Sequence, residues 1–146
     1  MMEAKQDIQI LQIKEIPFDM NREVNVTPEI MKEVKFSFLI VLQHIQGKNV
    51  VGLHTIVRYY LPDGKVLLEG GATLVASIPH WTEIEDSDEK IKSSSYVSEL
   101  VSYANAFVSG LFYKASEGTS LNSAFIPKIP VAELLKGMKV ELVKEG

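Results

Sequence analysis

The stretch from Tyr96 to Leu135, "YVSELVSYANAFVSGLFYKASEGTSLNSAFIPKIPVAELL", decides the fold. Its first half places apolar residues at the spacing of three and four that marks one face of a helix. Ser94 or Ser95 can cap the start of this helix, and Gly118 can close its end. Prolines then precede a short second helix. The apolar face consists of Val97, Leu100, Val101, Ala104, Phe107, Val108, Leu111, Phe112 and Ala115.

The opposite side of the long helix is also poorly suited to water. It carries Tyr96, Tyr103, Ala106, Gly110 and Tyr113. A helix that is apolar around most of its circumference is buried on both sides. One side can pack on a sheet of the same chain, and a second copy of the chain is the simplest cover for the other.

The sequence upstream of the helix predicts a sheet. In segment 33–46, residues Val34, Phe36, Phe38, Ile40 and Leu42 alternate on one face, as in a strand. Segments 50–61 and 66–78 are rich in β-branched and aromatic residues. Glycine-containing turns at 46–49 and 62–65 join the three segments. This pattern predicts an antiparallel meander.

Irregular points are also visible. In segment 7–18 the alternation slips between Ile10 and Leu11, which predicts a β-bulge, and Pro17 either ends this strand or confines its far end to a sheet edge. The pair Gly70 and Gly71 indicates a bulge, a bend or the close approach of another backbone. Segments 19–29 and 79–95 are polar and predict loops.

The predicted architecture is α+β. A four-stranded antiparallel meander sheet is followed by a long helix and a short second helix packed on one face, in a single domain of residues 1–146. The chain is 46% hydrophobic and 23% charged, as in globular proteins, and its net charge of −4 argues against nucleic-acid binding. It has no cysteine, no apparent signal peptide and no apolar run longer than Phe38–Leu42. We therefore expect a cytoplasmic protein that does not insert into membranes.

No pattern in the sequence predicts catalysis. The three histidines have no metal-ligand spacing, and there is no phosphate-binding loop or nucleophile elbow. The acidic run Glu83–Glu89 lacks the ligand pattern of a calcium loop and is interpreted as a solvated loop. His44 and His54 could face each other across a hairpin, but we interpret them as polar positions on a sheet face. We expect no enzyme, no metal and no cofactor.

The order of these elements resembles that of the SecB family of export chaperones, in which four antiparallel strands precede a long helix, a proline-bearing segment and a short helix. Here "IQILQIKEIPF" resembles the opening strand of the family. Pro28 to Phe38, "PEIMKEVKFSF", resembles the Pro-Glu-Val-Lys entry to its second strand, with an insertion. Ser102 to Thr119 resembles its helix with a Tyr-Ala pair, and Phe125 to Leu135 resembles its proline segment and short helix. The likeness spans about residues 8 to 137.

The chain also departs from the family. Ser102 and Asn105 flank the Tyr-Ala pair where the family has proline and arginine. The Leu-x-Glu that contacts the export motor SecA falls on Leu67 and Glu69, a possible partner contact, but alignment on the glycine pair shifts this register by three. The C-terminal stretch lacks a long acidic extension. These departures count against contact with a SecA-type motor.

The resemblance implies a SecB-like chaperone, or a binding protein derived from one, that holds non-native polypeptide for export or for one dedicated client. It also implies self-association as a dimer or tetramer. Candidate residues of the client-binding groove are Trp81, Phe112, Tyr113, Leu121, Phe125 and Ile126. The other interpretation places all six residues in the core or in a subunit interface.

Two further functions remain open at this point. The chain could carry a small apolar ligand in a cavity between the sheet and the helix. It could also be an enzyme that uses His44, His54 or Glu69.

Overall fold

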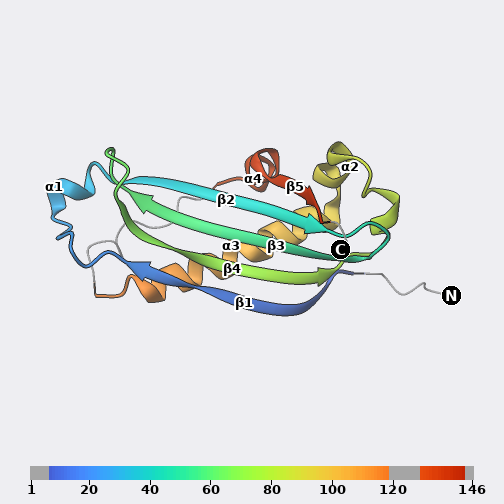
Figure 1. Ribbon diagram of the computed structural model, residues 1–146, viewed down its shortest axis with the longest axis horizontal. Helices are drawn as coiled ribbons and strands as arrows, with labels where there is room; N and C mark the ends of the chain where they lie inside the picture. Colours follow the sequence, from blue (N-terminus) through green and yellow to red (C-terminus); the bar gives the residue numbers. More distant parts are fainter. Residues whose placement is uncertain (1–6, 119–128, 144–146) are drawn as a thin grey trace.

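The computed structural model describes residues 7–118 and 129–143. One sheet with the strand order β1-β4-β3-β2-β5 forms a layer, and the helices α3 and α4 lie on one side of it (Figure 1). We call the side that faces α3 the inner face and the opposite side the outer face. The strands are β1 (Gln9–Met20), β2 (Lys35–His44), β3 (Val50–Tyr60), β4 (Val66–Ser77) and β5 (Lys139–Leu142).

The predicted meander is confirmed. Strands β2, β3 and β4 pair antiparallel in chain order, and β1 pairs antiparallel with β4. The register of β1 shifts between Ile10 and Gln12, where the sequence predicts a bulge. A second shift lies between Ile16 and Asp19, around Pro17. The strand continues beyond Pro17 because β1 is an edge strand, in which a bulge tolerates the missing N–H.

The glycine pair of β4 marks two close approaches, which is one of the three alternatives that the sequence left open. A Cβ atom on Gly70 would lie 2.5 Å from Cγ of Phe18, and one on Gly71 would lie 1.8 Å from the carbonyl oxygen of Thr55. Without a side chain at Gly70, Phe18 reaches the inner face and packs edge-on against Phe112, with 6.2 Å between the ring centroids. Both glycines are therefore required by packing.

The predicted four-stranded antiparallel sheet is wrong in one respect, since the sheet has five strands and is mixed. Strand β5 pairs parallel with β2 along Val41–His44. The backbone N–H of Val143 donates to the carbonyl oxygen of His44 over 2.7 Å. The short second helix positions this strand, because it ends at Gly137, two residues before β5 begins.

The segments predicted as loops contain helical turns. Segment 79–95 forms η1 (Trp81–Glu83) and α2 (Asp88–Ser93) before α3 begins. Ser87 caps α2 by accepting from the N–H of Lys90, and Ile91 is buried. Segment 19–29 leads into α1 (Pro28–Met31), which Thr27 caps. Side-chain caps and a buried apolar anchor thus order segments whose composition is polar.

Helix α3 (Ser95–Ala115) covers the inner face of the sheet, and Ser94 caps it as predicted. Its buried residues are Val97, Leu100, Val101, Ala104, Val108 and Phe112. The other side is open in the single chain, where Tyr103 is 47% and Tyr113 is 55% exposed. Helix α4 (Val131–Gly137) packs beside it. Among the helices that the structure describes, none combines the length and the apolar character needed to span a membrane.

Candidate functional site

The predicted groove residues fall into three groups. Trp81 and Phe112 are 0% and 1% exposed, so in the single chain they lie in the core and not on an accessible surface. Trp81 packs edge-on against His44, and Phe112 stacks on Tyr59 with ring centroids 4.8 Å apart. The same burial raises the pKa of Tyr59 well above its ordinary value. Tyr113 lies on the open side of α3. Leu121, Phe125 and Ile126 lie outside the described residues.

Strand β2 has an edge that is only half occupied. Strand β5 pairs with Val41–His44, whereas no described residue pairs with Lys35–Ile40 on that side. In Figure 1 this half of β2 forms the upper border of the sheet. Phe36 and Phe38 are half-buried there with ring centroids 6.1 Å apart, and Leu39 is 41% exposed. We call Lys35–Ile40 the open edge.

The alternation of a strand shows which backbone groups face this edge. The N–H and C=O of one residue point to the same side of a strand, and the side alternates with each residue. The carbonyl oxygen of His44 points toward β5, because it accepts from Val143. Since the side alternates with each residue, the backbone groups of Phe36, Phe38 and Ile40 point to the same side as those of His44 and face the open edge. Those of Ser37 and Leu39 face β3.

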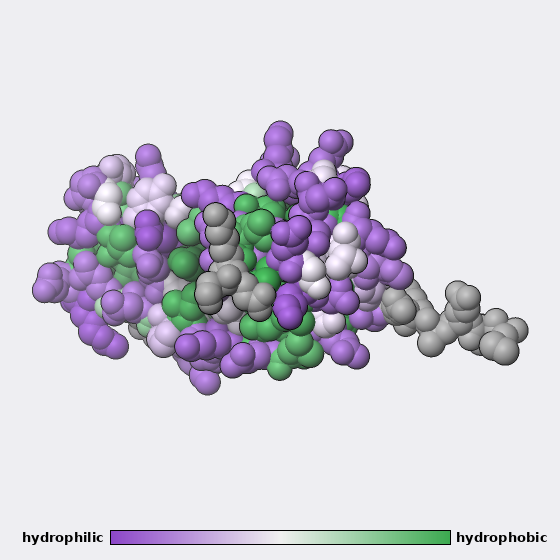
Figure 2. Space-filling view, turned by 45° about the vertical axis from the view of Figure 1, so that its right-hand side comes forward, coloured by the Kyte–Doolittle hydropathy of each residue, from purple (hydrophilic) through white to green (hydrophobic). Residues whose placement is uncertain are grey.

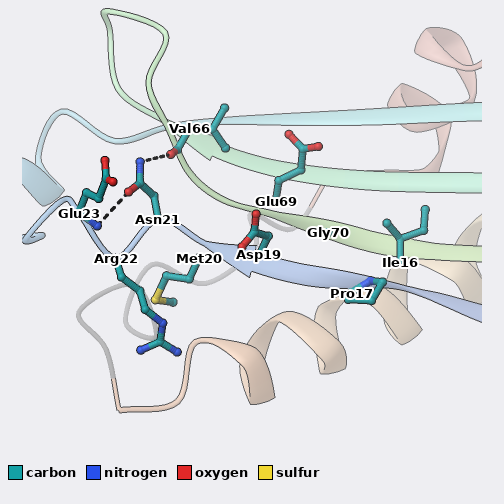
Figure 3. A pocket seen from close by; sticks show the side chains of 10 residues that line it. All are labelled: Ile16, Pro17, Asp19, Met20, Asn21, Arg22, Glu23, Val66, Glu69 and Gly70. Carbon is teal, nitrogen blue, oxygen red and sulfur yellow. Dashed lines mark hydrogen bonds between the residues drawn. The ribbon is translucent and has the colours of Figure 1, made fainter.

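A second feature is a hollow of about 560 Å³ where β1 and β4 meet near the end of β1 (Figure 3). Asp19 and Glu69 stand opposite each other in the register of the two strands. Glu69 pairs with Arg58 of β3, while Arg22 points away from both carboxylates. Asn21 holds the rim, because its amide donates to the carbonyl oxygen of Val66 over 3.3 Å. Carboxylates therefore predominate in the hollow, and Arg58 neutralises part of their negative charge.

The fold places Leu67 and Glu69, the two residues of the predicted partner contact, in different environments. Glu69 is half-buried on the outer face, within the acidic hollow. Leu67 is only 1% exposed, so in the single chain it lies in the core rather than on the surface. A register shift between Tyr59 and Tyr60 places Leu67 at an irregular point of the β3–β4 ladder, where it leaves the outer face.

The three residues considered for an enzyme do not form one site. His44 is buried on the inner face, whereas His54 lies on the outer face, so they do not face each other across the hairpin. Their cross-strand partners are Val51 and Val41. Glu69 is engaged with Arg58. No group of three or more histidine, aspartate or glutamate residues among the described ones could hold a metal ion.

The layer between the sheet and α3 is filled by side chains. Leu53, Leu74, Leu100 and Val108 show no exposed surface, and Phe112 shows 1%. This packing gives no support to the ligand cavity predicted between the sheet and the helix.

Comparison with known proteins identifies the fold. No protein-family model matches the sequence, and no curated protein matches it. Among solved structures, the chain is similar to the SecB-like chaperone Rv1957 of Mycobacterium tuberculosis, solved in complex with a ChAD peptide from the antitoxin Rv1956 HigA1. The TM-score is 0.51 with 9% sequence identity, and the match covers 85% of this chain and 91% of that chain. The chain thus has a SecB-like α+β fold.

Figure 2 shows one side of the molecule, where apolar residues lie in patches between hydrophilic ones. Such a surface offers several separate apolar contacts rather than one continuous apolar face. The open edge and the open side of α3 are two candidate interaction surfaces of the described residues.

Proposed function

We propose that this chain is a SecB-like cytoplasmic chaperone without enzymatic activity, which holds an extended segment of non-native polypeptide on the open edge of β2. The observation that carries the proposal is that β5 covers only Val41–His44 of a ten-residue strand. An added strand would continue the sheet beside Lys35–Ile40, end to end with β5. Strand addition gives affinity through backbone hydrogen bonds and needs no particular client sequence.

The side chains beside the open edge define the preferred client. Phe36 and Phe38 point toward the inner face, and Leu39 points toward the outer face. An added strand would place alternate side chains against these two sets. We expect the best clients to be extended segments of about six residues, with apolar side chains on at least every second residue.

Self-association as a dimer or tetramer belongs to the same proposal. The open side of α3 exposes Tyr103 and Tyr113 beside the small residues Ala106 and Gly110. Small residues let a second helix approach closely, and exposed tyrosines supply contact area. A second copy of α3 would bury both tyrosines, and Tyr113 then lies in a subunit interface rather than in a groove.

We further propose one dedicated client rather than delivery to a SecA-type motor. With Leu67 buried, only Glu69 remains of the motif that the sequence offers for that contact. The solved neighbour holds a peptide from an antitoxin, and it supports a polypeptide client without identifying the one for this chain.

The first test is client binding followed by amide hydrogen exchange. A reduced, carboxymethylated and therefore permanently unfolded protein serves as the client. The amides of Phe36, Phe38 and Ile40 should exchange quickly without client and slowly with it. The amides of Ser37 and Leu39 should be slow in both states, because they bond to β3. Client binding that leaves the even-numbered amides fast would refute the edge as the binding site.

A pair of variants gives an independent test. Phe38→Ser removes an aromatic side chain at the open edge, and Leu11→Ser removes an exposed side chain of β1, at the opposite border of the sheet. Light scattering of an aggregating client should show that Phe38→Ser needs about tenfold more protein for equal suppression. Leu11→Ser should act like the unchanged chain. Equal loss in both variants would place the client elsewhere.

A further inference from the structure

A glycine near the start of β3, Gly52, is not required by packing. Gly52 lies in regular pairing with Gln43 on one side and Val75 on the other. Apart from its chain neighbours, a Cβ atom on Gly52 would meet only Nε2 of His54, at 3.9 Å. Gly70 and Gly71, by contrast, are required by close contacts. A glycine inside a strand lowers stability, and where packing does not require it, it often marks the close approach of a ligand.

The absent side chain leaves a hollow on the outer face, which we call the Gly52 hollow. Its volume is about 310 Å³. The backbone of Gly52 forms the floor, and the apolar walls come from Val50, Val75 and Val143. Val50 and Val143 are 41% and 40% exposed, so apolar surface is available at the rim. The volume is at the lower end of the range for small-molecule sites.

The remaining wall is polar and held by hydrogen bonds. His54 Nε2 lies 2.8 Å from the side-chain oxygen of Gln43, and His54 Nδ1 lies 2.8 Å from the hydroxyl of Thr73. The side-chain nitrogen of Gln43 donates to Glu141 over 3.1 Å. The oxygen of Gln43 therefore faces the ring and accepts from Nε2–H, which leaves Nδ1 to accept from the Thr73 hydroxyl. These bonds link β4, β3, β2 and β5.

This polar wall selects the chemistry of a ligand. The oxygens of Thr73 and Gln43 retain lone pairs, so they can accept from one further donor. The carboxylate of Glu141 at the end of the chain of hydrogen bonds disfavours an anion. From the volume, the apolar walls and these acceptors, we infer that the Gly52 hollow binds a small neutral aromatic compound with one O–H or N–H donor.

A protein partner fits the same face less well. Beyond the rim, the outer face carries Lys14, Arg58, Glu69, Lys139 and Glu141. A stable protein interface needs about 800 Å² on each partner around an apolar centre. Charged residues are depleted at the centre of such interfaces, so these five residues disfavour a protein partner at the hollow. The ligand site is on the opposite face of the sheet from α3 and does not depend on client binding.

Titration of p-cresol into 15N-labelled protein tests the site. Backbone amide shifts should saturate and centre on Gly52, Thr73 and Val75. Gly52→Val fills the hollow with a side chain that suits a strand, and it should weaken binding by at least about tenfold. Gly137→Ala is the matched control, because Gly137 is exposed at the end of α4 with nothing near its added Cβ. It should bind p-cresol as the unchanged chain does.

Three results would overturn the inference: shifts that do not saturate, shifts centred elsewhere, and equal binding by Gly52→Val. If Gly52→Val lowers the melting temperature, Val75→Phe fills the same hollow from β4 and takes its place. The polar wall has its own test, in which 4-methylanisole replaces p-cresol and has no donor. The unchanged chain should prefer p-cresol, and Thr73→Val should lose that preference. A preference that survives in Thr73→Val would remove the polar wall from the proposal.

Discussion

The two faces of strand β3 differ in almost every property, although they alternate along one run of residues. On the inner face, Val51, Leu53, Thr55, Val57 and Tyr59 are each at most 3% exposed. On the outer face, Gly52, His54, Ile56, Arg58 and Tyr60 are half-buried or exposed. The inner face is fixed by packing against α3, whereas the outer face is held by polar bonds and leaves space at Gly52. Residues that stabilise the core therefore alternate along β3 with residues that line the proposed ligand site.

The largest effect should come from replacing an inner residue of β3. Leu53 has no exposed surface, so Leu53→Ala leaves a cavity between the sheet and α3. It should lower the free energy of unfolding by about 4 kcal/mol. Ile56→Ala removes a side chain of similar size from the half-buried outer face and should cost about 1 kcal/mol. Urea denaturation of both variants measures the difference. Equal costs would contradict the separation of the two faces.

The glycines provide a second contrast. Gly71→Ala places a Cβ atom 1.8 Å from the carbonyl oxygen of Thr55 and should destabilise the chain by about 3 kcal/mol. Gly52→Ala has free space and should raise stability by about 0.5 kcal/mol, because alanine loses less backbone entropy. Thermal unfolding of the two variants should therefore shift in opposite directions. A loss of stability in Gly52→Ala would show that the hollow has a structural role.

The inner face should also respond to alkaline pH. Because burial raises the pKa of Tyr59, the folded chain keeps this phenol neutral where the unfolded chain ionises it. This contribution to stability is complete below the ordinary tyrosine pKa of about 10 and is lost as the pH rises above it. Above that pH, Tyr59→Phe should reduce the slope of unfolding free energy by up to about 1.4 kcal/mol per pH unit. Identical slopes in the two chains would contradict this.

The smallest effect should come from the outer ion pair. Arg58 and Glu69 are 47% and 38% exposed at their side chains, so water and salt screen their attraction. Arg58→Ala should therefore cost at most about 1 kcal/mol in low salt and less at high salt. Denaturation at two salt concentrations checks this. A cost that does not depend on salt would indicate packing by the arginine stem instead.

The sequence allowed the meander and the long helix to be predicted, because alternation, turn glycines and a helical spacing are local signals. Strand β5 was missed because four residues, Lys139–Leu142, carry too little alternation to stand out. The helical turns at 81–93 were missed because their polar composition hides the buried anchors Trp81 and Ile91.

The interaction surfaces were harder to predict than the fold. Trp81 and Phe112 are aromatic residues whose burial depends on what covers them, which no spacing reveals. The contact between Gln43 and His54 could have been found from the hairpin at 46–49. The register of this hairpin pairs Gln43 with Gly52, and His54 lies two residues further along the same face of β3. Thr73 and Glu141 lie on other strands, so their part in the same chain of bonds required the sheet order.

The parallel strand has one more consequence, for the growing chain. Gln43 and Glu141 are separated by 98 positions, so β5 is synthesised long after the β2–β3 hairpin. Contacts this distant in sequence form late, after local pairs have closed. During translation, the whole length of β2 therefore lacks the strand that later covers half of its edge. An uncovered strand edge invites aggregation. A protein that we propose to bind the extended segments of other proteins therefore has an exposed β2 edge of its own until β5 has been synthesised and paired.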